Sequence, residues 1–208
     1  MTFAASDVCA LRFVRVLDTN DASTATALAA EIIAAGAALD VLVNNAGVST
    51  ANHPIDPIVQ NDVAELLAVL STNIGGTVAT TNALLPAMRA HGGGSRVVAT
   101  LSSDLGSIHG AFTAQSAMVQ AGGVSSYRIS KAALNMACRV YAAELAIEGF
   151  KVVALSPGWV ATDMGTKGGR LPPLTPKQSI TGCLSVILRL TPAQSGTFLK
   201  YDGSALAW

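Results

Sequence analysis

The sequence has little charge, and that charge is balanced. It contains 13 basic and 13 acidic residues among 208, and only 12% of its residues are charged. Nucleic acids and anionic membrane surfaces are bound by basic patches, so this balance argues against either partner. Because charged side chains go to surfaces, so few of them indicate a sheet covered on both faces or a helix face buried in an oligomer.

Cysteine is also scarce. The three cysteines, Cys9, Cys138 and Cys183, are far apart and lack C-x-x-C spacing. We therefore expect buried thiols in a reducing compartment, with no disulfide framework and no metal site. The first ten residues lack the basic and apolar regions of a secretory signal, so a cytoplasmic protein is expected.

Long apolar runs are nearly absent. The longest uncharged run, Leu66–Met88, is long enough on paper to span a bilayer, and the mean hydropathy of the chain is +0.46. Serine, threonine, asparagine, glycine and proline interrupt this run throughout. It therefore predicts a buried helix with a polar stripe, and no membrane partner.

What the sequence does contain is an alternation of short apolar strands and longer helices. Strands are expected at 12–17, 40–43, 95–101, 151–155 and 197–200, and helices at 23–35, 61–90, 126–148 and 177–190. Strands that alternate with helices form βαβ units, so the fold class is α/β with a parallel sheet. The length fits a single domain over residues 1–208.

Polar and turn residues follow most of the predicted strands. They are Asp18, Asn44–Asn45, Ser102–Ser103 and Pro157–Gly158. Ligands of open α/β sheets bind outside the carboxyl ends of the strands, so a site is expected at this edge.

Tyr127 and Lys131 are four residues apart at the start of a predicted helix and share one face. An ammonium group near a phenol favours the phenolate, so Lys131 is expected to lower the pKa of Tyr127 toward the working range of an acid–base catalyst. The competing interpretation is an ordinary solvated helix face, which is what most such pairs are.

Four motifs occur in one order along the chain. Asn44-Asn45-Ala46-Gly47, Ser102-Ser103-x-x-Gly106, Tyr127-x-x-x-Lys131 and Pro157-Gly158 each begin at a strand or helix end. With this order the chain, from about residue 12 to its end, resembles the short-chain dehydrogenases/reductases. Residues 127–135, residues 157–165 and the last eleven residues resemble the C-factor/sniffer group of carbonyl reductases. The resemblance implies a Rossmann-type doubly wound parallel sheet in three αβα layers.

The resemblance also implies a reaction, hydride transfer between a nicotinamide cofactor and a carbonyl or alcohol carbon. Tyr127 would be the acid and base, and Lys131 would lower its pKa and hold the nicotinamide ribose. Ser103 would orient the substrate carbonyl and stabilise charge on its oxygen. Asn73 matches the residue that holds a water in the proton relay; alternatively, it satisfies a neighbouring backbone group.

Further residues match the cofactor contacts of that family. Asp18 matches the adenine contact, Asn45 the adenosine-side contact, and Val160 and Thr162 the nicotinamide-side contacts, beside Tyr127 and Lys131. The resemblance favours NADP over NAD, a small-molecule carbonyl or alcohol as substrate, and no metal. The long helix with Asn73 and the helix from Tyr127 are those through which the family forms homodimers and homotetramers.

Two departures from the family pattern stand out. The interval from Ser103 to Tyr127 is longer than usual, so residues 108–123 are expected to form a lid over the site. The glycine-rich turn that binds the cofactor pyrophosphate is absent, and with it the first βαβ unit, about 40 residues. We therefore expect an N-terminally truncated reductase. The alternative is an inactive member that keeps only the fold and the oligomer contacts.

Overall fold

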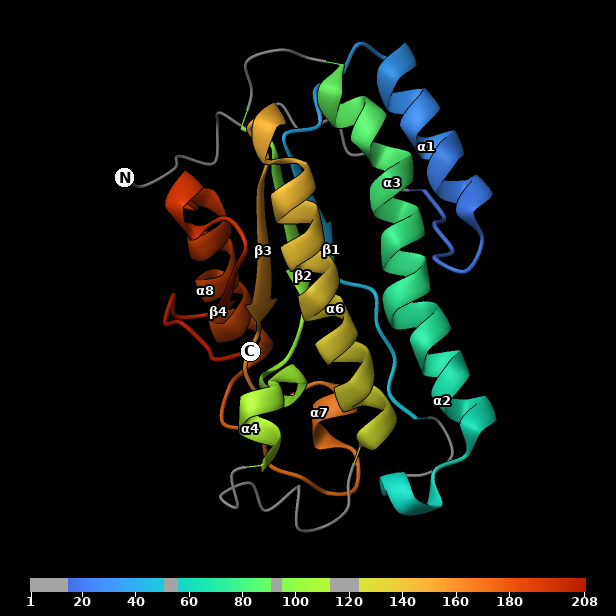
Figure 1. Cartoon of the computed structure of the whole chain (residues 1–208), viewed down its shortest axis with the longest axis vertical. Coiled ribbons are helices and arrows are strands. Elements are labelled where there is room, and N and C mark those ends of the chain that lie inside the picture. Colours follow the sequence, from blue (N-terminus) through green and yellow to red (C-terminus); the bar gives the residue numbers. More distant parts are fainter. Residues whose placement is uncertain (1–14, 51–55, 91–94, 113–123) are drawn as a thin grey trace.

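A four-stranded parallel sheet organises the molecule. The computed structural model describes residues 15–50, 56–90, 95–112 and 124–208. Strands β1 (Val41–Asn44), β2 (Val97–Leu101), β3 (Lys151–Ser156) and β4 (Thr197–Lys200) lie side by side in that order, and each pair of neighbours is parallel (Figure 1). The predicted α/β class and parallel sheet are confirmed.

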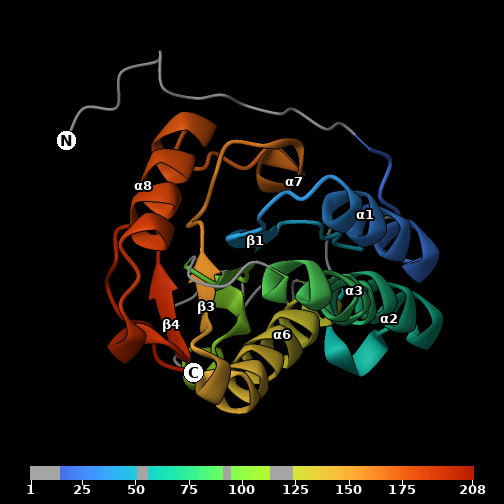
Figure 2. The same ribbon diagram turned by 90° about the horizontal axis from the view of Figure 1, so that it is seen from above.

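Helices cover both faces of this sheet, which gives the three αβα layers. Helices α1 (Ala22–Ala34), α3 (Thr77–Arg89) and α6 (Ser125–Glu144) cover one face, and α8 (Pro176–Leu188) covers the other (Figure 2). Helix α2 (Val63–Leu70) precedes α3. The short helices α4 (Ile108–Phe112) and α7 (Asp163–Thr166) lie beyond the carboxyl ends of the strands (Figure 1).

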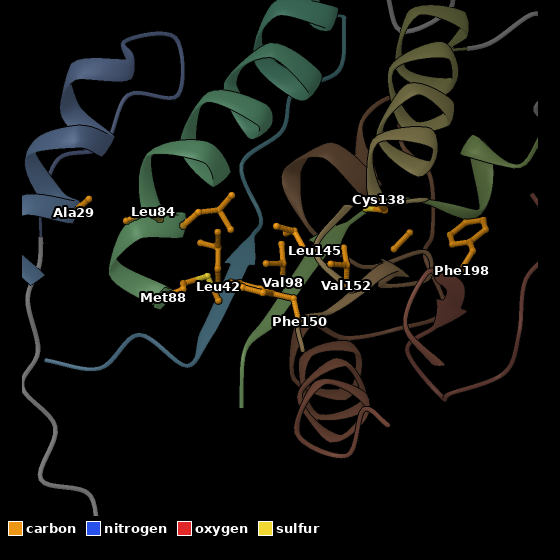
Figure 3. Close-up of a cluster of buried hydrophobic side chains, with 12 residues drawn as sticks. Ala29, Leu42, Leu84, Met88, Val98, Cys138, Leu145, Phe150, Val152 and Phe198 are labelled. Carbon is orange, nitrogen blue, oxygen red and sulfur yellow. The ribbon is translucent and has the colours of Figure 1, made fainter. Parts of the chain in front are cut away.

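The core has two halves, one on each side of the sheet. In β3, Val152 and Ala154 pack under α3 and α6, while Val153 and Leu155 pack under α8. All four side chains are fully buried, as expected for a strand with both faces covered. Figure 3 shows the first half, in which Leu84 and Met88 of α3 lie beside Leu42 of β1, and Val98 and Val152 continue the cluster across the sheet.

The predicted helix at 61–90 is interrupted. A π-helical turn, Ser71–Gly76, separates α2 from α3 and contains Asn73. Gly76 lies against the loop before α1, where an added Cβ atom would come within 2.6 Å of Thr19 Cβ. Such π turns are frequent at functional sites, and this one carries a predicted site residue.

The first predicted strand is not formed as expected. Residues 12–14 lie outside the described part of the chain, and residues 15–17 have no strand structure. Helix α1, in contrast, begins at the predicted cap, where Asp21 accepts a hydrogen bond from Ser23 N. It ends just before Gly36, and Gly36 has a left-handed backbone conformation. Within the described residues, β1 is therefore paired on one edge only, to β2.

Several compositional predictions can be compared with the structure. Cys138 and Cys183 are free and buried as predicted, and Cys9 lies outside the described residues.

In the described residues, one continuous helical stretch, Val63–Arg89, is long and apolar enough to cross a membrane by length and composition alone. Its polar residues Asn73 and Thr81 are buried against the rest of the protein.

Candidate active site

A cavity of about 590 Å³ opens at the carboxyl edge of the sheet. It is bounded by the residues that follow β1, β2 and β3, by the first turns of α6 and by the loop around α7. Six of the predicted site residues line it: Asn45, Ser103, Tyr127, Lys131, Val160 and Thr162. Side chains predicted from separate motifs, as many as 117 positions apart, therefore meet in one place.

Tyr127 and Ser103 contact each other through their hydroxyl groups. Ser103 follows β2 and caps a short 3-10 turn, where its Oγ accepts a hydrogen bond from Leu105 N at 3.2 Å. Burial raises the pKa of Tyr127, the hydrogen bond from Ser103 lowers it by less, and the negative charge of Asp104 raises it further. The net effect is a phenol that stays protonated at neutral pH.

The neighbouring serine, Ser102, has a different role. Its Oγ lies 2.6 Å from Asn135 Oδ1 of α6 and is buried. Asn135 in turn donates to the backbone oxygen of Gly106 at 3.2 Å. The hydroxyl of Ser102 thus ties β2 to α6, whereas that of Ser103 meets Tyr127.

Lys131 is almost fully buried, with 3% of its surface exposed. Its Nζ donates a hydrogen bond to the backbone oxygen of Leu101 at 2.7 Å and lies 5.4 Å from the centre of the Tyr127 ring. Burial lowers the pKa of the Lys131 ammonium to about 8. The expectation that Lys131 brings the pKa of Tyr127 down is wrong in net direction, because burial of the phenol dominates.

Asn73 is fully buried at the centre of the π-helical turn. Its Oδ1 accepts from Val48 N at 2.7 Å, and its Nδ2 donates to Val48 O and to Ser130 Oγ, both at 2.9 Å. The side chain therefore joins the loop after β1 to α6, one turn from Tyr127. These contacts are those of the alternative interpretation, in which Asn73 satisfies neighbouring polar groups.

Of the other predicted cofactor contacts, Val160 and Thr162 line the cavity and Asp18 does not. Thr162 caps α7 by accepting from Gly165 N at 3.2 Å, and Val160 forms an isolated bridge with Leu174. Asp18 does not line the cavity; its Oδ1 accepts from Asn20 N at 2.9 Å in the loop before α1. Of the predicted lid, residues 108–112 form α4 and residues 113–123 lie outside the described residues.

Gly106 allows the turn after β2 to approach α6 at Lys131. An added Cβ atom would lie 2.8 Å from both the carbonyl carbon and Cβ of Lys131, closer than real Cβ contacts. Gly106→Ala is therefore expected to destabilise the fold by about 1–3 kcal/mol, the usual cost of overpacking. Urea denaturation measures the loss. Gly75→Ala is the control, because a Cβ atom there meets nothing within 4 Å and helix propensity favours alanine; equal losses would contradict the account.

Asp56 does not line the cavity but positions α6, which does, and the sequence did not indicate this role. It is 5% exposed, and its Oδ2 accepts from Ser126 N at 2.8 Å and from Asn61 Nδ2 at 3.1 Å. Its backbone oxygen accepts from Ser125 N at 3.3 Å. These bonds cap the first turn of α6 immediately after Val124, a left-handed residue that lines the cavity. Because the cap comes from 70 positions away, no local sequence signal could have revealed it.

Asp56→Ala is expected to lower the free energy of unfolding by about 1–3 kcal/mol, because it leaves the buried N–H of Ser126 without a partner and removes one of the two bonds made by Asn61 Nδ2. Asp62→Ala is the matched control: Asp62 caps α2 at an exposed position by accepting from Ala64 N at 2.9 Å. The control should lose about 1 kcal/mol or less. A smaller loss for Asp56→Ala than for Asp62→Ala in urea denaturation would contradict the assignment.

Comparisons with known proteins agree with this geometry. The family model for short chain dehydrogenases matches residues 9–170. The C-signal protein of Myxococcus xanthus is 40% identical over 170 residues, which cover 82% of this chain and 93% of that protein.

Two solved structures are also similar. The carbonyl reductase Sniffer of D. melanogaster is 32% identical, with a TM-score of 0.78 over 92% of this chain and 76% of that chain. The NADPH-bound carbonyl reductase from chicken fatty liver is also 32% identical, with a TM-score of 0.79 over 92% of this chain and 75% of that chain. Matching family, fold and neighbours together show that the chain belongs to the short-chain dehydrogenase/reductase family of oxidoreductases and is similar to its carbonyl reductases.

Proposed function

We propose that this protein catalyses reversible hydride transfer between a nicotinamide cofactor and a small carbonyl or alcohol compound. The observation that carries the proposal is the meeting of Ser103, Tyr127 and Lys131 in one cavity, with the hydroxyls of Tyr127 and Ser103 in contact. A substrate carbonyl oxygen placed between these two hydroxyls would accept a hydrogen bond from each.

Tyr127 is the proton donor in the reducing direction. Because burial and the charge of Asp104 raise its pKa, the phenol is protonated at neutral pH and ready to donate to the carbonyl oxygen. Ser103 donates to the same oxygen and stabilises the negative charge that develops on it. The oxidising direction needs the phenolate and is therefore favoured only at higher pH.

Lys131 is the buried cation of the site, next to Tyr127. One of its N–H groups is bonded to Leu101 O. Within the described residues the other two have no hydrogen-bond partner and could donate to the hydroxyls of a ribose or to a proton relay. Asn73 fixes α6 at Ser130, next to Lys131, and also fixes the loop after β1. Asn73 would therefore act on the proton relay indirectly, by positioning α6 and the loop after β1.

The residues present fit the nicotinamide end of the cofactor. Gly47 leaves open space beside the Lys131 ammonium, since an added Cβ atom would come within 3.4 Å of Lys131 Nζ and of Asn73 Oδ1. Asn45, Val160 and Thr162 line the same cavity. When bound, the nicotinamide supplies or accepts the hydride. Solved relatives that hold NADPH or NADP support NADP as the cofactor. Asp18 is proposed as its adenine contact.

Exposed apolar side chains support a homodimer or homotetramer. Helices α2 and α6 lie next to each other and expose Val63, Leu67, Met136 and Val140. A second copy that covers these side chains would explain why the surface carries so little charge. The buried free thiols of Cys138 and Cys183 are consistent with a cytoplasmic location.

The experiment that tests the proposal is oxidation of NADPH and of NADH by the purified chain with a panel of aldehydes and ketones. We expect turnover with NADPH and a lower rate with NADH. A folded oligomer, verified by circular dichroism and gel filtration, that oxidises neither cofactor with any carbonyl would instead favour an inactive member that keeps only the fold.

A further inference from the structure

Arg170 occupies the wall of the cavity contributed by the loop after α7. One side of its guanidinium is bonded to that loop: Nε donates to Lys167 O at 2.7 Å, and Nη2 donates to Met164 O at 3.0 Å. In the described part of the chain, Nη1 has no hydrogen-bond partner. The two backbone bonds hold the guanidinium plane in place before any ligand arrives.

The free edge of this guanidinium has a definite chemical preference. A guanidinium carries five N–H groups, of which the two backbone bonds use two. The remaining edge, with Nη1 and the second N–H of Nη2, presents two parallel donors. Two parallel donors match the two oxygens of a carboxylate, and a side chain that is already fixed loses little entropy on binding one.

The other charged side chains that line the cavity are Lys131, Asp104 and Asp163, and none of them offers two parallel donors. Lys131 is bonded to Leu101 O, and Asp104 contacts Ser156 and lies 3.7 Å from Lys200 Nζ. Asp163 is exposed at the start of α7 and, among the described residues, forms no ion pair with Arg170. Asp163 would weaken a general attraction for anions, so binding of an anion would depend on the directed bonds of Arg170.

We propose that Arg170 anchors the carboxylate of the substrate, so that the preferred substrates are aldehydes or ketones that carry a carboxylate at the end remote from the carbonyl. The inference rests on the proposed function, which places the carbonyl at Tyr127 and Ser103. The apolar side chains of Trp159, Met164 and Ile180 line the same cavity and would contact the body of the substrate. A phosphate of the cofactor offers Arg170 similar chemistry, so the experiment must separate the two sources.

The test compares two aldehydes of the same shape, 4-formylbenzoate and the neutral 4-formylbenzamide. The quantity compared is kcat/KM for the carboxylate divided by kcat/KM for the amide. In Arg170→Gln this ratio should fall by about 10- to 100-fold, the effect expected from loss of a charge-assisted hydrogen-bonded pair. Arg170→Lys keeps the charge but loses the parallel donors and should give an intermediate ratio. Lys177→Gln is the control: Lys177 is an exposed cation of α8 that does not line the cavity, and its loss should leave the ratio as it is.

A second measurement does not depend on turnover. Calorimetric titration with 4-(hydroxymethyl)benzoate, without cofactor, should show binding that weakens about 10- to 100-fold in Arg170→Gln. Binding that depends on Arg170 in a protein without turnover would support this inference while contradicting the proposed function. Turnover with an unchanged ratio would overturn the inference alone. A rise in the KM for NADPH that is equal with both aldehydes would assign Arg170 to the cofactor and also overturn it.

Discussion

Tyr127→Phe is expected to lower kcat/KM for carbonyl reduction by about 10²- to 10⁴-fold, the range found for loss of a general acid. The substitution removes the proton donor and its contact with Ser103, while the ring keeps its place beside Lys131. Because one hydroxyl is lost at a partly buried position, the free energy of unfolding should change by only about 1 kcal/mol. Steady-state oxidation of NADPH, with urea denaturation of the same preparations, measures both quantities.

Tyr141→Phe is the matched control for this experiment. Tyr141 lies on the same helix, away from the cavity, and its hydroxyl donates to Asn82 Oδ1 at 2.8 Å. It should keep the wild-type kcat/KM. Equal activity of Tyr127→Phe and Tyr141→Phe would remove Tyr127 from the chemistry and leave it a structural residue of α6.

Replacement of Lys131 by methionine is expected to lower kcat/KM by about 10²- to 10³-fold, as for loss of a charged donor in an enclosed site. It should also change the pH profile. Burial lowers the pKa of Lys131 to about 8, so the ammonium is charged below this pH and loses its charge as the pH rises through it. The pKa of Tyr127 is raised, so its phenol stays protonated across that range. Carbonyl reduction by the wild type should therefore fall above about pH 8, and this decrease should be absent in Lys131→Met.

Lys151→Met provides the comparison, because Lys151 Nζ also donates to a backbone oxygen, that of Leu190 at 2.9 Å, but outside the cavity. Its pH profile should match that of the wild type. The assignment fails if Lys131→Met keeps the alkaline decrease, because another group would then be the one that titrates.

The parallel sheet could be predicted because its strands are recognisable from the local sequence. The run from Lys151 to Ser156 is apolar and bounded by a glycine and a proline, and it forms β3 within one residue of expectation. Residues directly after such strands must lie at one edge of the sheet. For this reason Asn45, Ser103 and Gly158 could be assigned to one site, and all three line the cavity.

Features that depend on distant contacts could not be predicted in this way. Asp56 caps a helix that begins 69 positions later, and nothing around it in the sequence marks that contact. The balance between burial and charge at Tyr127 depends on how deeply α6 is packed, which the spacing to Lys131 does not report. Asp18, predicted as the adenine contact at the end of an expected strand, does not line this cavity, and that contact stays a prediction.

Transfer of deuterium tests the central claim most directly. The purified chain would be incubated with benzaldehyde and NADPH in which both hydrogens at C4 of the dihydronicotinamide are replaced by deuterium, and the alcohol would be analysed by mass spectrometry and proton NMR. The account predicts one deuterium on the carbinol carbon of the benzyl alcohol formed by the wild type, and formation of this alcohol by Tyr127→Phe that is about 10²- to 10⁴-fold slower. Unlabelled benzyl alcohol, or no alcohol from a folded chain that binds the cofactor, would contradict it.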